Sequence, residues 1–389
     1  MIKSGQIVCS SVPKSLHLST VPARGLCTSQ TFSKESAHLK YRQLTRQQNL
    51  TGHLSREQRN PTYCEYSYKS QANMSSQRVP IEPQRVDAPL TQSATFLVVS
   101  VTDKPDAIET VRSTLSGLDS LAKNVSIRDL GAQFSCTVGI GSGIWDRLIS
   151  LPRPSELHPF REIKGAKHTA VSTPGDLLFH IRSERRDICF EFERQLMDQL
   201  GDAVSVVDET VGFRYFDVRD LLGFVDGTAN PVGPAAPDSV FIEEEDTSAS
   251  GGSYIVAQKY THNLPGWKDL STEQQEKIIG RTKIDNVELD DAESGQLSHK
   301  TLNTIEDEDG NEHDILRDNM PFGSPGSGEF GTYFIGYTRR LWVIEKMLER
   351  MFVGEPPGLH DRILDFSKPL TGTTFFAPPA SLLANLGSK

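Results

Sequence analysis

The stretch Gly223-Phe224-Val225-Asp226-Gly227-Thr228-Ala229-Asn230-Pro231 holds one carboxylate, that of Asp226, between two glycines. Glycine allows the backbone to approach a flat ligand closely or to adopt a positive φ, and Asn-Pro ends any regular element before it. An aspartate presented in this way can be half-desolvated over a bound group, with a pKa that its surroundings set. The spacing alone favours a simpler interpretation, an aspartate in an ordinary strand-to-turn connection.

A second stretch, Ile315-Leu316-Arg317-Asp318-Asn319-Met320-Pro321-Phe322-Gly323, adds a cation and an amide. Arg317 and Asn319 are two residues apart on a predicted strand, so their side chains should point the same way, about 7 Å apart. A permanent cation and an amide aimed into one cavity suit an anionic or peroxidic ligand. The alternative is a surface arginine and a turn asparagine before Pro321, and the residues alone favour neither interpretation.

Together the two stretches resemble the dye-decolorizing peroxidase family, which is recognised by a GxxDG motif and a later distal arginine. An asparagine two residues after the arginine makes the sequence similar to the bacterial, B-type branch of the family. The resemblance covers about residues 90 to 385 and implies an α+β fold. In that fold, two ferredoxin-like halves form a dimeric α+β barrel within one chain, with haem b bound in the C-terminal half. We therefore expect a disordered extension over 1–88, an N-terminal half over 89–235 and a C-terminal half over 236–389.

The axial ligand of the implied haem cannot be chosen by spacing alone, because the chain has ten histidines. His299 stands where the family's proximal histidine is found, eighteen residues before Arg317. His313 shares a predicted hairpin with Arg317. Because it is an even number of residues away from Arg317, strand alternation puts it on the same face as Arg317 and Asn319. An axial ligand must lie on the other side of the porphyrin, so we expect His299 to bind the iron.

Three further residues are candidates for supporting the cofactor. A haem-ligating histidine is normally oriented through its second nitrogen, and Asp361 is the expected acceptor, with Asp365 behind it. Either acid could instead be a plain surface residue. Arg281 is a candidate for pairing with a haem propionate, because arginine recognises carboxylates in a bidentate manner.

The implied function is a haem peroxidase that uses H2O2 to oxidise bulky organic, dye- or phenol-like reductants by electron transfer. Asp226 would move the peroxide proton, Arg317 would stabilise charge on the departing oxygen, and Asn319 would orient the peroxide or its water. Candidates for a relay to the surface are Tyr333, Tyr337 and Trp342. Two rivals remain, a haem carrier or iron-releasing protein with little turnover and a structural α+β barrel without haem.

Composition excludes several other classes of protein. The formal net charge of −10 speaks against non-specific nucleic-acid binding, and no run approaches the ~20 apolar residues of a membrane helix. The five cysteines form no CxxC pair and leave an odd thiol, which favours a reducing compartment. We expect neither nucleic acid nor membrane as a partner, and we expect a homo-oligomer.

The charge is unevenly distributed along the chain. Residues 1–80 carry eleven lysines and arginines against three acids, a net charge of +8, so the remainder carries −18. A basic segment rich in Ser, Thr and Gln is typical of a transit peptide, which predicts a mitochondrial location. The alternative is a cytoplasmic protein whose translation begins at Met74.

Hydrophobic periodicity predicts the same element order twice, strand–helix–strand–strand–helix–strand. In the first half the strands are expected at 95–101, within a hairpin over 126–138, at 176–181 and at 203–216, with helices from 105 and over 185–200. In the second half strands are expected at 253–260 and 332–337, helices from 271 and over 341–352, and a hairpin with arms 302–305 and 315–317. Residues 80–89, spaced by prolines, are expected to be a linker.

Overall fold

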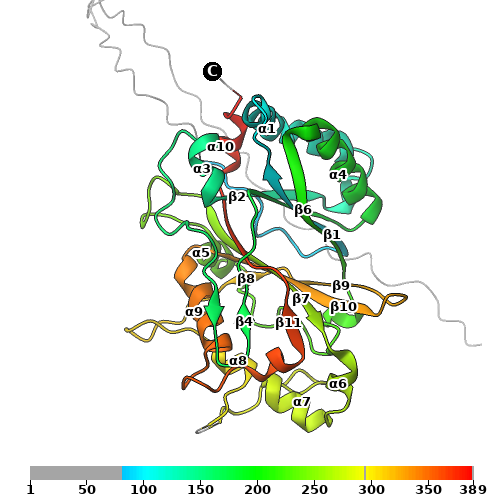
Figure 1. The fold of residues 1–389 in the computed structure, drawn as a ribbon, viewed down its shortest axis with the longest axis vertical. Coiled ribbons are helices and arrows are strands. Elements are labelled where there is room, and N and C mark those ends of the chain that lie inside the picture. Colours follow the sequence, from blue (N-terminus) through cyan, green and yellow to red (C-terminus); the bar gives the residue numbers. More distant parts are fainter. Residues whose placement is uncertain (1–80, 293–294, 388–389) are drawn as a thin grey trace, which may run out of the picture. The chain divides into compact units, whose positions relative to one another are not determined.

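The frame of the fold is one ten-stranded antiparallel sheet, seen in a computed structural model that describes residues 81–292 and 295–387 (Figure 1). Residues 1–80, which include most of the expected N-terminal extension, lie outside the described part. Eight of the strands follow the order β6-β1-β5-β2-β12-β7-β10-β8, and β9 and β11 pair with β10 and β7. This order consists of the same four-strand pattern twice.

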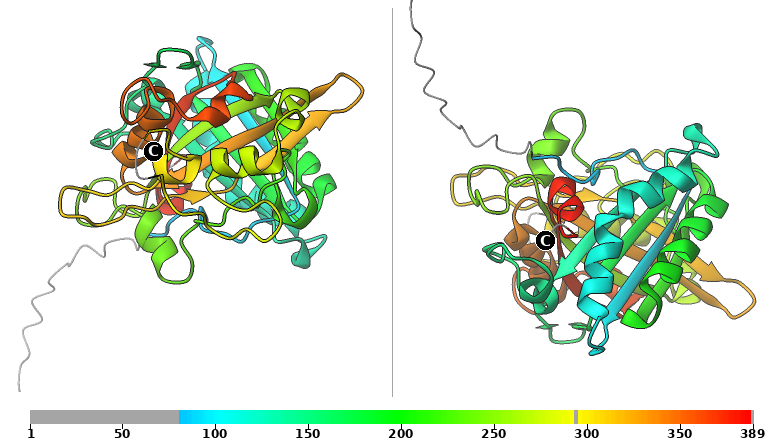
Figure 2. Two further views of the ribbon diagram at one scale, coloured as in Figure 1. Left: turned by 90° about the horizontal axis from the view of Figure 1, so that it is seen from below. Right: turned by 90° about the horizontal axis from the view of Figure 1, so that it is seen from above.

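The N-terminal half places its fourth, first, third and second long strands side by side, as in a ferredoxin-like fold. Its strands are β1 (Ser93–Val101), β2 (Ser135–Gly141), β5 (Leu177–Ser183) and β6 (Val204–Phe213), beside a small hairpin of β3 (Ile163–Lys164) and β4 (Thr169–Ala170). Its helices are α1 (Ala107–Ser116), α2 (Leu118–Ser126), α3 (Ser142–Leu148) and α4 (Arg186–Leu200), with 3₁₀ turns η1 (Leu130–Ala132), η2 (Gly201–Ala203) and η3 (Phe216–Val218). Figure 2 shows α1, α2 and α4 over one face of this sheet.

The C-terminal half repeats that pattern, which confirms the expected pair of ferredoxin-like halves. Its strands are β7 (Ser253–His262), β8 (Leu316–Arg317), β9 (Met320–Ser324), β10 (Glu329–Thr338), β11 (Ser367–Pro369) and β12 (Thr373–Ala377). Its helices are α5 (Ala235–Val240), α6 (Leu264–Lys268), α7 (Thr272–Ile279), α8 (His299–Leu302), α9 (Leu341–Phe352) and α10 (Ala380–Ala384), with the 3₁₀ turn η4 (Arg362–Asp365).

The two halves meet along two seams. At one seam β12 pairs with β2, which makes the sheet continuous. At the other seam β6, the first strand of the order, lies beside β9, which pairs with β10 near the other end. A Cβ atom at Gly212 would lie 2.6 Å from the Cβ of Met320, so glycine is needed for this approach. The sheet therefore curves round into a barrel.

Side chains alternate between the two faces of the curved sheet. The inner face forms one apolar cluster, which includes Phe96, Ile255, Tyr333, Ile335 and Phe375. The outer face packs against helices, α1, α2 and α4 in the first half and α9 in the second. The functional cavity lies on this outer face of the second half.

Three local predictions were wrong. The first arm of the hairpin expected over 126–138 is instead the end of α2 followed by η1, because the apolar stripe of the helix continues through Val125. The other expected hairpin has no strand at 302–305; Leu302 ends α8, and a single bridge joins Glu306 to Glu312. The residues interpreted as a linker are packed, since Gln84 and Val86 are 6% and 1% exposed.

Candidate active site

A cavity between α9 and the outer face of the C-terminal sheet brings together Asp226, His299, Arg317 and Asn319. Arg281 and His313 also line it. Much of the remaining wall is apolar and includes Phe224, Ile279, Ile315, Phe334, Ile344, Met347, Leu348, Met351, Ile363 and Leu364.

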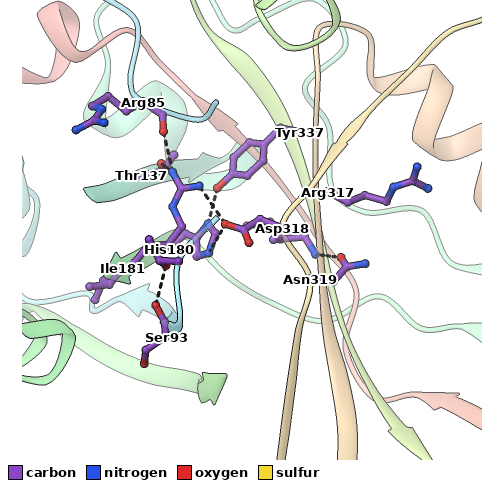
Figure 3. Close-up of polar contacts among 12 residues, drawn as sticks. Arg85, Ser93, Thr137, His180, Ile181, Arg317, Asp318, Asn319 and Tyr337 are labelled. Atoms are coloured by element: carbon purple, nitrogen blue, oxygen red, sulfur yellow. Dashed lines mark hydrogen bonds and ion pairs between the residues drawn. The ribbon is translucent and has the colours of Figure 1, made fainter. Parts of the chain in front are cut away.

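The alternation of the strand aims Arg317 and Asn319 into the cavity. Arg317 ends β8, where it pairs with Gly336 of β10, and it and Asn319 both line the cavity. The residue between them, Asp318, is turned to the interior of the barrel and is 1% exposed (Figure 3). The prediction that the side chains of Arg317 and Asn319 point the same way is therefore confirmed.

Asn230, in the motif's Asn-Pro pair, fastens the Asp226 loop to this strand. Its Oδ1 accepts a hydrogen bond from the Arg317 N–H at 3.0 Å, and its Nδ2 donates to the Arg317 carbonyl at 2.7 Å. The Asn230 side chain thus makes the pair of hydrogen bonds that the backbone of a neighbouring strand would make, and it fixes the backbone of Arg317 relative to the loop. Gly227 has a φ of 75°, and a Cβ there would lie 3.3 Å from Asn230 Nδ2. Sequence reasoning treated Asn230 only as a breaker of regular structure.

Asp226 lies in the electrostatic field of its neighbours. Burial raises the pKa of Asp226 above its ordinary value, while the charge of Arg317 and the hydrogen bond from Asn319 act in the opposite direction. That hydrogen bond joins Asn319 Nδ2 to Asp226 Oδ1 at 3.2 Å. Burial also lowers the pKa of Arg317, but an arginine pKa starts at ~12 or higher, so the guanidinium stays charged.

His299 is held by a buried carboxylate. It is the first residue of α8, which Ser298 caps, and its Nδ1 lies 2.6 Å from Oδ2 of Asp361. Asp361 is 0% exposed, and its other oxygen accepts a hydrogen bond from the Ile363 N–H at 3.0 Å. A carboxylate can only accept, so the proton is on Nδ1 and the lone pair of Nε2 is left to face a ligand.

The other two cavity candidates are already paired with protein groups. His313 Nε2 lies 3.0 Å from Asp307 Oδ2, in the acidic turn. Arg281 donates from Nε to Asn286 at 3.0 Å and from Nη1 to Glu288 at 2.9 Å. His299 therefore has Nε2 available, in a ring that Asp361 orients through Nδ1. The ring of His313 is instead hydrogen-bonded through Nε2 to the half-exposed Asp307.

Behind the cavity, Asp318 joins the two halves through buried charges (Figure 3). Its carboxylate accepts hydrogen bonds from Arg182 at 3.0 Å and from Arg214 at 3.3 Å. His180, whose Nδ1 lies 2.7 Å from the hydroxyl of Tyr337, is 3.8 Å from the same carboxylate. Burial and the nearby Arg182 lower the pKa of His180 far below its ordinary value, so the imidazole is neutral. Sequence reasoning did not identify this cluster.

Two of the three relay candidates are unsuited to a surface role. Tyr333 and Tyr337 are 1% and 0% exposed and point into the barrel. Burial raises the pKa of each phenol. Trp342 alone of the three is partly exposed, and its ring lies 5.1 Å from that of His313 on the cavity wall.

The cavity residues fit a haem. An apolar wall suits a porphyrin, and His299 offers an oriented nitrogen of the kind that binds iron. Gln258, also in the wall, is 0% exposed, and its Nε2 has no hydrogen-bond partner among the described residues. A buried amide without a partner is costly, which is consistent with a cavity that is completed by a bound group.

Comparisons with known proteins agree with this assignment. Residues 83–214 match the family model "Dyp-type peroxidase, N-terminal", and residues 217–382 match "Dyp-type peroxidase, C-terminal". A dye-decolorizing peroxidase of Mycobacterium tuberculosis is 51% identical over 303 residues, 78% of this chain and 90% of that protein.

Solved structures give the same answer. A single-residue variant of Rhodococcus jostii DypB in complex with heme is 54% identical, with a TM-score of 0.76 over 78% of this chain and 98% of that one. The encapsulated DyP-type peroxidase of Mycobacterium smegmatis is 51% identical, with a TM-score of 0.76 over 79% of this chain and 98% of that one.

These comparisons also correct one expectation. The mitochondrial location predicted from the basic N-terminal segment is wrong, because the relatives at 51–54% identity are bacterial proteins and bacteria have no mitochondria. Within residues 81–292 and 295–387, no helix has both the length and the apolar character needed to cross a bilayer.

Both family models match, together they span most of the chain, and the solved relatives share its fold. The chain belongs to the dye-decolorizing peroxidase family, with B-type neighbours, and is a haem-dependent peroxidase that oxidises organic reductants with H2O2.

Proposed function

We propose that His299 is the axial ligand of haem b, that Asp361 orients it, and that Asp226, Arg317 and Asn319 handle the peroxide. One observation carries this proposal. A single cavity contains a histidine held from behind by a buried carboxylate and a carboxylate hydrogen-bonded to an amide beside an arginine. These are the two halves of a peroxidase site, a metal ligand and a place to move a proton.

Haem, when bound, supplies the iron at which H2O2 is reduced and through which electrons are drawn from the reductant. Asp226 in its ionised form would accept a proton from one oxygen of the peroxide and return it to the other. Asn319 Nδ2 holds Oδ1 of Asp226, so the carboxylate keeps one orientation while it carries the proton. The raised pKa of Asp226 makes it a better proton acceptor than an exposed aspartate.

Arg317 provides a fixed positive charge where negative charge develops on the departing oxygen. Its Nη2 donates to the carbonyl of Ala229 at 3.3 Å, and its backbone is held by Asn230. The guanidinium is thereby aimed before the substrate arrives, which avoids a reorganisation cost during the reaction.

We also propose that the haem belongs to the half over 236–389, that Arg281 approaches a propionate, and that the protein forms a homo-oligomer. Exposed apolar side chains near the end of β6 support an interface, since Phe213, Phe216 and Val218 are 39%, 73% and 39% exposed. Light scattering coupled to gel filtration tests the oligomer, and a monomer at micromolar concentration would contradict it.

Haem titration followed by a dye assay tests the proposed function. We expect one haem per chain, with a Soret band, and H2O2-dependent bleaching of an anthraquinone dye that is lost when haem is omitted. A haem-handling protein would bind haem with the same stoichiometry but bleach no more dye than free haem does.

A further inference from the structure

Two histidines and an aspartate converge outside the active-site cavity. His168 lies between β3 and β4, His360 lies just before η4, and Asp365 is the last residue of η4. His168 Nε2 and His360 Nε2 each lie 3.0 Å from Oδ1 of Asp365, and the three donor atoms are within 4.8 Å of one another. None of these three residues lines the cavity.

We propose that His168, His360 and Asp365 form a binding site for a divalent transition-metal ion of the Zn²⁺ type. Imidazole nitrogens and a carboxylate oxygen are the ligands that such ions prefer, at ~2.0–2.2 Å from the metal. Ligand atoms that lie within 4.8 Å of one another can surround one ion of that size, and three protein ligands leave one tetrahedral position for water. The side chains are 17–21% exposed, so an ion can enter from solvent.

A hydrogen-bonded cluster is the competing interpretation, because Lys167 Nζ lies 2.5 Å from the same oxygen of Asp365. That interpretation places three donors on Oδ1, whereas no hydrogen bond to Oδ2 occurs among the described residues. A carboxylate oxygen offers two lone pairs, so this crowding is unfavourable as hydrogen bonding and favourable for one cation shared by the ligands. Lys167 is 59% exposed and can swing into water when an ion arrives.

The three proposed ligand side chains are already oriented toward one another. The rings of His168 and His360 meet edge to face, with centroids 4.8 Å apart, and both direct Nε2 to the same oxygen. Metal binding therefore requires loss of imidazole protons and displacement of one lysine, without rearrangement of the backbone.

The position of the cluster gives the ion a structural role. It joins the β3–β4 hairpin of the N-terminal half to the segment that contains Asp361, the partner of His299. The carbonyl of His360 also accepts a hydrogen bond from Gln296 at 3.0 Å. A bound ion would fasten this segment and stabilise the folded protein by mass action.

Calorimetric titration of the haem-loaded, full-length protein with ZnCl2 tests the proposal. Other histidines and cysteines of the chain bind Zn²⁺ as background, so the measured quantity is the difference between variants. We expect wild type to bind one more equivalent than either His168→Ala or His360→Ala. His158→Ala is the matched control, because His158 is a half-buried histidine paired with Glu345 at 3.2 Å, and it should retain that equivalent.

Lys167→Ala sharpens the test, since it removes the competing cation and leaves all three ligands in place. We expect Zn²⁺ to bind that variant roughly two- to fivefold more tightly, the range that an exposed ion pair supports. Crystals of the wild type soaked in ZnCl2 locate the ion independently of variant folding, by anomalous scattering at the zinc edge. A peak between the three side chains supports the proposal, and its absence, or equal stoichiometry in wild type and both histidine variants, overturns it.

Discussion

Asp318 Oδ2 lies 3.0 Å from Arg182 Nη1, and through this pair the strand that bears Arg317 and Asn319 is joined to the N-terminal half of the barrel. Both side chains are 1% exposed. Arg214 approaches the other carboxylate oxygen at 3.3 Å. Because Asp318 is the residue between the two cavity residues, its ion pairs anchor the backbone from which Arg317 and Asn319 project.

We expect Asp318→Asn to lower the free energy of unfolding by ~3–5 kcal/mol, because it leaves two buried guanidinium groups without a counter-charge. Chemical denaturation of the haem-loaded protein measures this loss. Asp309→Asn, an exposed acid in the turn, is the control and should change stability by less than ~0.5 kcal/mol. Equal stabilities of the two variants would contradict the role of Asp318.

The variant Asp361→Asn should still bind haem, but the hydrogen bond to His299 Nδ1 should weaken. The amide can still accept from Nδ1 but carries no charge, so the imidazole becomes a poorer electron donor to iron. We expect a more positive reduction potential and ~10–100-fold slower peroxide turnover. Asp309→Asn, an exposed acid outside the cavity that does not contact His299, should leave the potential unchanged. The same potential in Asp361→Asn and wild type would count against this pairing.

Arg317 and Asp226 should contribute unequally at neutral pH. We expect Arg317→Leu to slow the first H2O2-dependent change in the haem spectrum by ~10²–10³-fold, more than Asp226→Asn does. The charge of Arg317 is permanent, whereas ordered water can replace part of the proton transfer by Asp226. Stopped-flow mixing measures both rates, and a larger, pH-independent defect in Asp226→Asn would reverse this ranking.

The pH dependence follows from the raised pKa of Asp226. Its carboxylate acts as a base only when ionised, so its contribution is present above that pKa and is lost as the pH falls through it. The loss should therefore begin at a higher pH than for an ordinary aspartate, whose pKa is ~4. Arg317→Leu removes the charge that lowers this pKa, and we expect its rate profile to shift to higher pH. An unchanged pH–rate profile in Arg317→Leu would show that the charge of Arg317 does not lower the pKa of Asp226.

Residues 1–73 should be dispensable for peroxidase chemistry. All the proposed site residues and both family matches lie beyond Met74, at residues 83–382. We expect a chain that starts at Met74 to bind one haem and to bleach dye at the full-length rate, within twofold. A loss of haem binding in the shorter chain would show that the segment contributes to the site.

The sequence predicted the element order and the direction of Arg317 and Asn319, because both depend on local hydrophobic period and strand alternation. It could not predict contacts between distant segments. Asn230 meets the Arg317 backbone across 87 residues, and Arg182 meets Asp318 across 136 residues. No local pattern marks such pairs. The four-residue helix that begins with His299 was missed because it is too short to show a period.

The central claim is that His299, and not His313, binds the haem iron, and the haem content of two purified variants tests it most directly. Removal of an axial nitrogen affects cofactor retention first. We expect His299→Ala to lose most of its haem on gel filtration, or to keep it weakly with an altered Soret band, while His313→Ala keeps one haem per chain. Retention of haem with an unchanged spectrum in His299→Ala, together with its loss in His313→Ala, would contradict the account.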